Sequence, residues 1–147
     1  MTFVGDRGLC VSHARDLGPQ FVANPHRMIG QDGAYSIPLG EESLWYFGDT
    51  LVGARVPHES LWYPGGRQLG PGDMSGQGTI EQMLTNTGLV LRNRTGRDGL
   101  TEFSYICDAC GRIRQLVPHL DSEDTNEIRV WCLHGLAVDS RVYLYYI

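Results

Sequence analysis

The sequence predicts an all-β protein built from antiparallel hairpins, and three observations support this fold class. Nineteen glycines and seven prolines among 147 residues exceed the roughly 12% of average usage, which favours short elements joined by tight turns. Runs rich in β-branched and aromatic residues alternate with short polar segments. Apolar residues do not recur at helical spacing over any long window, so only 11–17 and 79–84 have room for a helical turn or two.

The first hairpin is expected between Ala34 and Gly53. The run AYSIPLG leads into Glu41 and Glu42, and the run SLWYFGDTLVG leads away from them. Both runs are typical of strands, and the polar pair beside Gly40 is typical of a tight turn. We therefore predict an antiparallel pair with Glu41 and Glu42 as its two turn residues.

Four more strands are predicted further along the chain. TGLVLR at 87–92 and EFSYIC at 102–107 flank a turn at 96–99, and LHGLAV and RVYLYYI flank a turn at Asp139–Ser140. The first and last hairpins form an internal repeat about a hundred residues apart. Repetition of a four-stranded unit is typical of a β-propeller.

Composition excludes several classes of function. The formal charge is −5, and the twelve basic residues, all arginine, are spread along the chain, so nucleic acid is not an expected partner. The absence of lysine excludes Schiff-base chemistry. No window reaches the eighteen or so apolar residues of a membrane span, and the first residues lack the order of a signal peptide. We expect a soluble, cytoplasmic protein with no membrane partner.

The segment DGAYSIPLGEESLWYFGDT, at 32–50, resembles glycosidase-like five-bladed β-propellers, which are relatives in fold of the arabinanases, invertases and levansucrases. NTGLVL at 86–91 and the later VWCLHGLAVDSRVYLYY support the likeness. The resemblance implies a sugar-active fold whose catalytic carboxylates lie on inner strands around a central pocket. Asp32 occupies the position of the first of these carboxylates, near the start of blade one.

The expected organisation is one incomplete propeller domain over residues 1–147. Blade one covers about 30–110 with a long loop at 53–78, and blade two begins at about 128–147. Because five closed blades need roughly 300 residues, the chain is expected to be a fragment that ends inside blade two. Its unpaired sheet edge and apolar flank predict self-association.

Asp32 and Asp49 are candidate sugar-binding carboxylates. With Glu41 and Glu42 in the turn, Asp49 lies opposite Ala34 and Asp32 opposite Leu51, so the two carboxylates become diagonal neighbours on one face. Paired carboxylates can flank a glycosidic bond. The structural alternative makes Asp32 a turn residue before Gly33, and makes Asp49 the start of an Asx-type turn.

Aromatic side chains are candidate sugar platforms because axial C–H groups stack on aromatic planes. Tyr35 and Trp62, the latter on the long loop, are predicted substrate-binding residues, together with Asp49 and with His134 of the second blade. Trp45 and Phe47 are expected on one face of their strand and Tyr46 on the other.

The cysteines offer a second kind of site. Cys107-Asp-Ala-Cys110-Gly has the spacing of a zinc knuckle, and Cys132 and His134 supply two further ligand types. Zinc is the one cofactor that this pattern indicates, and the carbohydrate prediction requires no cofactor.

The sequence thus predicts a glycoside-hydrolase-like propeller fragment that binds carbohydrate, with Asp32 as general base or nucleophile when the propeller is complete. Two alternatives stay open. One is a non-catalytic carbohydrate-binding or protein-interaction module, and the other is a small β domain stabilised by zinc.

Overall fold

The structure is a computed structural model that describes residues 13–21, 24–54, 80–92 and 95–147. It confirms the all-β prediction, since the described residues form strands and one short 3-10 turn, η2, at Gly96–Asp98. None of the described segments forms a helix with the length and apolarity needed to cross a bilayer. The strands are β1 Met28–Gln31, β2 Ala34–Leu39, β3 Glu42–Phe47, β4 Thr50–Gly53, β5 Ile80–Leu84, β6 Thr87–Leu91, β7 Phe103–Tyr105, β8 Cys132–Val138 and β9 Arg141–Tyr146.

The predicted four-stranded antiparallel unit is present as the sheet β2-β3-β6-β7. β2 pairs with β3, β3 with β6 and β6 with β7, all antiparallel, so the strands follow one another as a meander. The turn between β6 and β7 contains η2, whose C-cap Gly99 adopts a left-handed φ of 81°. The second hairpin is also confirmed, with β8 and β9 joined at Asp139 and Ser140.

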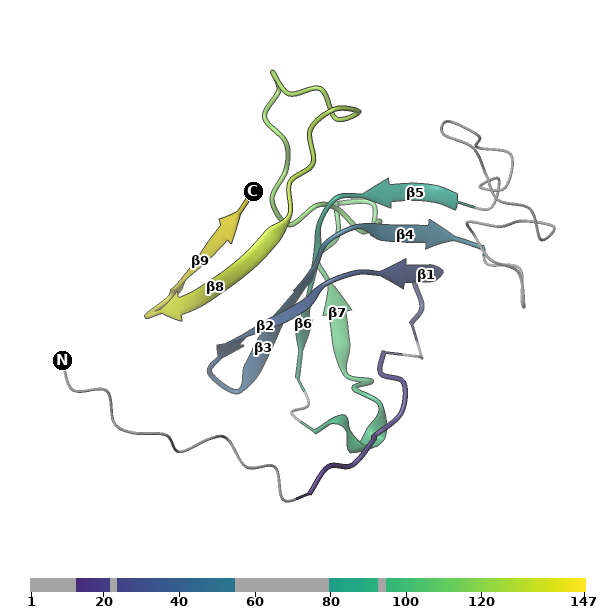
Figure 1. Ribbon diagram of the computed structural model, residues 1–147, viewed down its shortest axis with the longest axis vertical. Helices are drawn as coiled ribbons and strands as arrows, with labels where there is room; N and C mark the ends of the chain where they lie inside the picture. The colour runs from purple at the N-terminus through teal and green to yellow at the C-terminus, as the bar shows by residue number, and fades with distance from the viewer. Residues whose placement is uncertain (1–12, 22–23, 55–79, 93–94) are drawn as a thin grey trace.

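The first hairpin is longer than predicted and bends in its middle. Beyond β2 and β3 the same two segments of the chain continue as β1 and β4. These strands pair in a second antiparallel sheet of order β1-β4-β5. The next ribbon bends in the same way, since β5 runs into β6 through Thr85 and Asn86. Figure 1 shows β1, β4 and β5 lying across the direction of β2, β3 and β6. The two sheets thus share long segments that bend and contribute one strand to each sheet. Strands commonly pass from one sheet to another through such bends.

Two predictions are wrong in detail. The turn residues of the first hairpin are Gly40 and Glu41 rather than Glu41 and Glu42, because Leu39 pairs with Glu42 and Gly40 takes a φ of 62° that suits glycine. Residues 80–84 form strand β5 and no helical turn, because pairing with β4 outweighs local propensity. The 53–78 loop lies almost wholly outside the described residues.

The four-stranded sheet carries a hydrophobic cluster on each face. Alternation along β3 divides its aromatic residues as predicted, with Phe47 and Trp45 on one side and Tyr46 on the other. The first cluster lies between the two sheets. Its buried members are Phe47, Leu84, Leu89, Leu91, Leu100, Tyr105 and Ile113. The second cluster joins the opposite face to the β8–β9 hairpin, and its buried members are Ile37, Leu44, Tyr46 and Cys132.

Gly135 allows β8 to approach β2 closely. A Cβ at this position would meet the backbone oxygen of Tyr143 at 2.8 Å and the end of the Leu144 side chain at 2.9 Å, and it would also press on Ile37. Real Cβ atoms do not come so near a backbone oxygen, so the hairpin seats on the sheet only with glycine here.

Asn86 fastens the bend between β5 and β6 to two distant segments. Its side chain is fully buried, its amide nitrogen donates to the carbonyl oxygens of Val117 and Val130, each at 2.9 Å, and its amide oxygen accepts from Val117 N at 2.8 Å. One side chain therefore provides hydrogen-bond partners for three backbone groups in the segment that follows β7.

We predict that Asn86→Ala lowers the free energy of unfolding by roughly 3 kcal/mol, since each buried polar group left without a partner costs about 1–3 kcal/mol. The melting temperature should fall by roughly 10 °C. Asn86→Asp should be at least as damaging, because a carboxylate cannot donate to the two carbonyls. Chemical denaturation measures both, with Asn126→Ala, at an exposed asparagine, as the matched control. A loss of unfolding free energy under about 0.5 kcal/mol for Asn86→Ala would show that the Asn86 hydrogen bonds are dispensable.

Candidate functional site

The candidate site lies where the first hairpin bends. Asp32 N donates to Asp49 O at 3.0 Å and Gly48 N donates to Asp32 O at 2.9 Å, so the Asp32 backbone bonds to both residues of the opposite strand at this point. Gln31 pairs with Thr50 and Ala34 with Phe47, so each strand contributes two residues to the junction between the sheets and the register is the same on both sides. The predicted partners, Ala34 for Asp49 and Leu51 for Asp32, are corrected by this register: Ala34 pairs with Phe47, and Leu51 with Gly30.

The structure nevertheless brings the two predicted carboxylates together, directly opposite each other rather than diagonally. Asp32 is exposed and Asp49 is half-buried. Asp32 lines two adjoining hollows, one of about 320 Å³ that also contains Tyr35 and one of about 180 Å³ that also contains Asp49. Asp32 is therefore a lining residue that the two hollows share.

Glycine at position 48 makes room for the Asp32 carboxylate. A Cβ on residue 48 would collide with Asp32 Oδ1 and would stand 3.7 Å from the Trp131 ring. Among the described residues no group donates a hydrogen bond to the Asp32 side chain, including the turn hydrogen bond before Gly33 that a structural role would require. The carboxylate is thus left available to a ligand.

Trp131 forms the other wall of the larger hollow. Its indole Nε1 donates to Asp49 Oδ1 at 3.0 Å, and its backbone exchanges two hydrogen bonds with Ile147, at 2.9 and 3.0 Å. The side chain is 38% exposed. The full lining is Asp32, Gly33, Tyr35, Gly48, Trp131, Cys132 and Leu133. The contact with Asp49 fixes the plane of the ring while leaving part of its face open.

Tyr35 lines the same hollow. Its ring stacks on Tyr46 with a centroid separation of 5.6 Å and an interplanar angle of 19°, and it is 42% exposed. Tyr46 is itself buried, and burial raises the pKa of its phenol, with Cys132 and Tyr35 adding to the effect. Burial likewise raises the pKa of the Cys132 thiol. The floor behind Tyr35 is thus uncharged at neutral pH.

A polar network lies behind the bend on the opposite side of the ribbon. Thr50 and Thr87 are fully buried, and their hydroxyl oxygens are 2.8 Å apart. Gln31 Nε2 donates to Thr87 Oγ1 at 3.0 Å, and Tyr105 OH donates to Gln31 Oε1 at 2.7 Å. Thr50 Oγ1 also bonds Gly48 O at 3.0 Å, so the network holds the residue that faces Asp32.

The other predicted sugar-binding residues do not join this group. His134 lies on β8 with its ring stacked on Tyr145, at 6.3 Å between centroids, and it does not line the hollow. Trp62 lies outside the described residues. Trp131 was missed by the sequence prediction. The signal that could have found it is its place as the tryptophan that opens the second hairpin.

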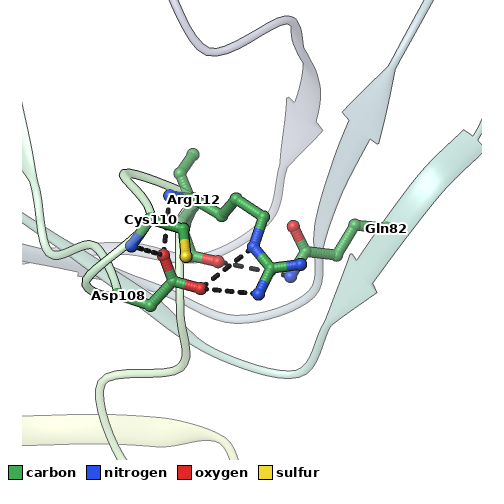
Figure 2. A network of polar contacts seen from close by, with 5 residues as sticks. Gln82, Asp108, Cys110 and Arg112 are labelled. Carbon is green, nitrogen blue, oxygen red and sulfur yellow. Dashed lines mark hydrogen bonds and ion pairs between the residues drawn. The ribbon is translucent and has the colours of Figure 1, made fainter.

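The cysteine-rich turn is well formed but isolated. The Asp108 carboxylate accepts hydrogen bonds from the backbone of Cys110 and Arg112, at 2.9 and 3.0 Å, and pairs with the Arg112 guanidinium (Figure 2). These bonds, led by the Arg112 backbone N–H, lower the pKa of Asp108. Burial raises the pKa of the Cys107 thiol.

The four predicted zinc ligands do not converge. Cys107 packs against the first core cluster, whereas Cys132 belongs to the second, on the other face of the sheet, and His134 is exposed on β8. In the part of the chain that the structure describes, no three His, Cys, Asp or Glu side chains are grouped so as to hold a metal ion. The knuckle-like turn is accounted for by Asp108 and by the bridge between Cys107 and Ile113.

Comparisons with protein-family models, with curated proteins and with solved structures find no match to this chain. Assignment of function therefore depends on the geometry of the bend.

Tyr105 should make the fold sensitive to alkali. Burial raises its pKa from 10.0 to about 12, against the lowering effect of hydrogen bonds with Asn24 and Gln31. The folded state holds this proton more tightly than the unfolded chain does. The contribution of Tyr105 to the free energy of unfolding is therefore fully present below about pH 10 and is lost as the pH rises through about 12.

We predict that Tyr105→Phe has a lower free energy of unfolding at neutral pH, because two hydrogen bonds are lost. Its free energy of unfolding should then decline less steeply between pH 10 and 12 than that of the wild-type protein. Urea unfolding midpoints measured from pH 8 to 12 test this, with Tyr145→Phe, at a side chain 59% exposed, as the control. Equal slopes in the wild-type and Tyr105→Phe proteins would contradict the assignment.

Proposed function

We propose that this protein binds carbohydrate in the hollow at the bend of the first hairpin. The observation that carries the proposal is the convergence of Asp32, Asp49, Trp131 and Tyr35 on this one bend. Carboxylates accept hydrogen bonds from sugar hydroxyls, and the partly exposed faces of Trp131 and Tyr35 offer apolar planes to C–H groups. A concave site with few polar groups among apolar walls is the usual form of a small-molecule site.

The catalytic part of the proposal concerns Asp32. Its carboxylate is exposed, receives no hydrogen bond from the described residues, and stands opposite a second carboxylate that is engaged by Trp131 Nε1. Asp32 would act as general base or nucleophile on a glycosidic bond, while Asp49 orients the aromatic platform. The partner carboxylic acid would come from a later blade of a complete glycosidase-like propeller.

The propeller assignment has structural support at the level of one repeating unit. The meander β2-β3-β6-β7 has the strand order of an up-and-down blade, and the β8–β9 hairpin that packs beside it would begin the next one. We propose a cytoplasmic, glycoside-hydrolase-like protein. The alternative, a non-catalytic carbohydrate-binding module, uses the same hollow and differs only in the role of Asp32.

Trp131→Ala should weaken saccharide binding, because stacking on an aromatic ring is lost together with the wall of the hollow. We expect an affinity at least tenfold weaker, which corresponds to about 1.4 kcal/mol. Titration with a panel of neutral oligosaccharides, monitored by NMR chemical-shift changes, measures the affinity. Leu120→Ala removes an apolar side chain that is 67% exposed and lines neither hollow, and it should leave the affinity unchanged. Equal affinity of the Trp131→Ala and wild-type proteins would place any sugar site elsewhere.

Asp32→Asn separates the two roles. In a chain that carries the complete propeller, the substitution should abolish hydrolysis while saccharide affinity changes little, because a base or nucleophile acts on charge that develops in the transition state. The melting temperature should change little, since the side chain receives no hydrogen bond from the described residues. Turnover, affinity and melting temperature are measured on the same variant. Full turnover in the Asp32→Asn protein would show that Asp32 is neither the general base nor the nucleophile.

A further inference from the structure

Two cysteine thiols lie on one tight turn at 107–113. Cys107 stands at the start of the turn, where it pairs with Ile113, and Cys110 lies at the tip. Cys107 is half-buried, Cys110 is exposed, and both are free thiols. Cys132 is buried in the second core cluster. Among the described residues, Cys107 and Cys110 are therefore the two thiols that share a segment of the chain.

Backbone hydrogen bonds reverse the chain directly after Cys107. Asp108 N donates to Arg112 O at 2.8 Å, Gly111 N donates to Asp108 O at 3.0 Å, and Gly111 takes a left-handed φ of 79° that suits glycine. Three residues of extended chain would span roughly 10 Å, whereas a disulfide joins Cα atoms that are at most about 7 Å apart. The reversal therefore shortens the separation of Cys107 and Cys110 in the way that a disulfide requires.

The Asp108 side chain holds the turn in this shape. Its Oδ1 accepts hydrogen bonds from Cys110 N at 2.9 Å and from Arg112 N at 3.0 Å, and its Oδ2 accepts one from Arg112 Nε at 3.0 Å (Figure 2). The bond to Cys110 N fixes the backbone that carries the exposed thiol. A segment that is already ordered loses little entropy when two of its groups join, which raises the effective concentration of one thiol at the other.

We propose that Cys107 and Cys110 form a redox-active dithiol that exchanges with low-molecular-weight disulfides, represented here by glutathione disulfide. The Cys110 thiolate attacks one sulfur of this disulfide, the S–S bond breaks, and the departing glutathione takes up the proton that Cys110 released. The Cys107 thiolate then attacks Cys110 Sγ and displaces the second glutathione, which takes up the proton of Cys107. The dithiol loses two electrons and two protons, and glutathione disulfide becomes two molecules of glutathione.

The surroundings of the two sulfurs determine the order of these steps and their reversibility. Burial, together with the neighbouring Asp108 carboxylate, raises the pKa of the Cys107 thiol, so the exposed Cys110 is the thiol that meets a molecule in solution first. The bond closes a short loop, and it therefore constrains the unfolded chain little. Reductants can reach the exposed Cys110, and exposed disulfides are the labile ones. The geometry thus favours a reversible redox pair over a structural disulfide.

Equilibration of the full chain with mixtures of reduced and oxidised glutathione tests the proposal. After free thiols are alkylated, peptide mass spectrometry should find Cys107 joined to Cys110, with a mass lower by that of two hydrogen atoms. At about 0.1 mM reduced glutathione the joined form should exceed the mixed disulfide at least tenfold, since a tethered thiol acts at an effective concentration on the order of 1 mM or more. Cys107→Ser should stop at the mixed disulfide on Cys110. A wild-type chain that also stops there, or that stays reduced, would overturn the proposal.

The same equilibrium measured in urea separates the folded turn from the cysteine spacing alone. The unfolded chain keeps the spacing but lacks the turn, so its equilibrium constant for the joined form should be at least tenfold smaller. Asp108→Ala should lower the constant of the folded protein, whereas Asp121→Ala, at an exposed aspartate outside the turn, should leave it unchanged. A constant in urea that equals or exceeds that of the folded chain would overturn the proposal, and so would a wild-type constant in folded Asp108→Ala protein.

Discussion

The whole structure depends on how its ribbons turn a corner without leaving backbone groups unpaired. A sheet that bends sharply loses part of its ladder, and buried N–H and C=O groups then need other partners. At this corner the partners are side chains. Thr50 covers the carbonyl of Gly48 at 3.0 Å, and Asn86 covers three backbone groups of Val117 and Val130. Fully satisfied polar networks of this kind fix one conformation of a core, whereas incomplete ones destabilise it.

The corner also explains why the candidate site lies where it does. Asp32 follows β1 and Asp49 precedes β4, so each sits at the point where its ribbon leaves one sheet for the other. Their neighbours at the same junction, Gly33 and Gly48, carry no side chains. Gly48 completes the arrangement because any larger residue would occupy the space of the Asp32 carboxylate. The junction at which the strands pass from one sheet to the other therefore exposes a carboxylate beside the rings of Tyr35 and Trp131.

Local features of the fold could be read from the sequence, and long-range contacts could not. The hairpins at 34–47 and 132–146 were predictable because short polar turns separate runs of strand-forming residues. The register of the first was misjudged by one turn residue, since Gly40 and Glu41 compete with Glu41 and Glu42 and local composition does not decide between them. The contact between Trp131 and Asp49 joins residues 82 positions apart. No turn or periodicity within either segment encodes it.

The β8–β9 hairpin supplies one wall of the candidate site from a distant part of the chain. Trp131 pairs through its backbone with Ile147, directly beyond β9, and through its indole with Asp49. Anything that orders β9 therefore also orders one wall of the hollow.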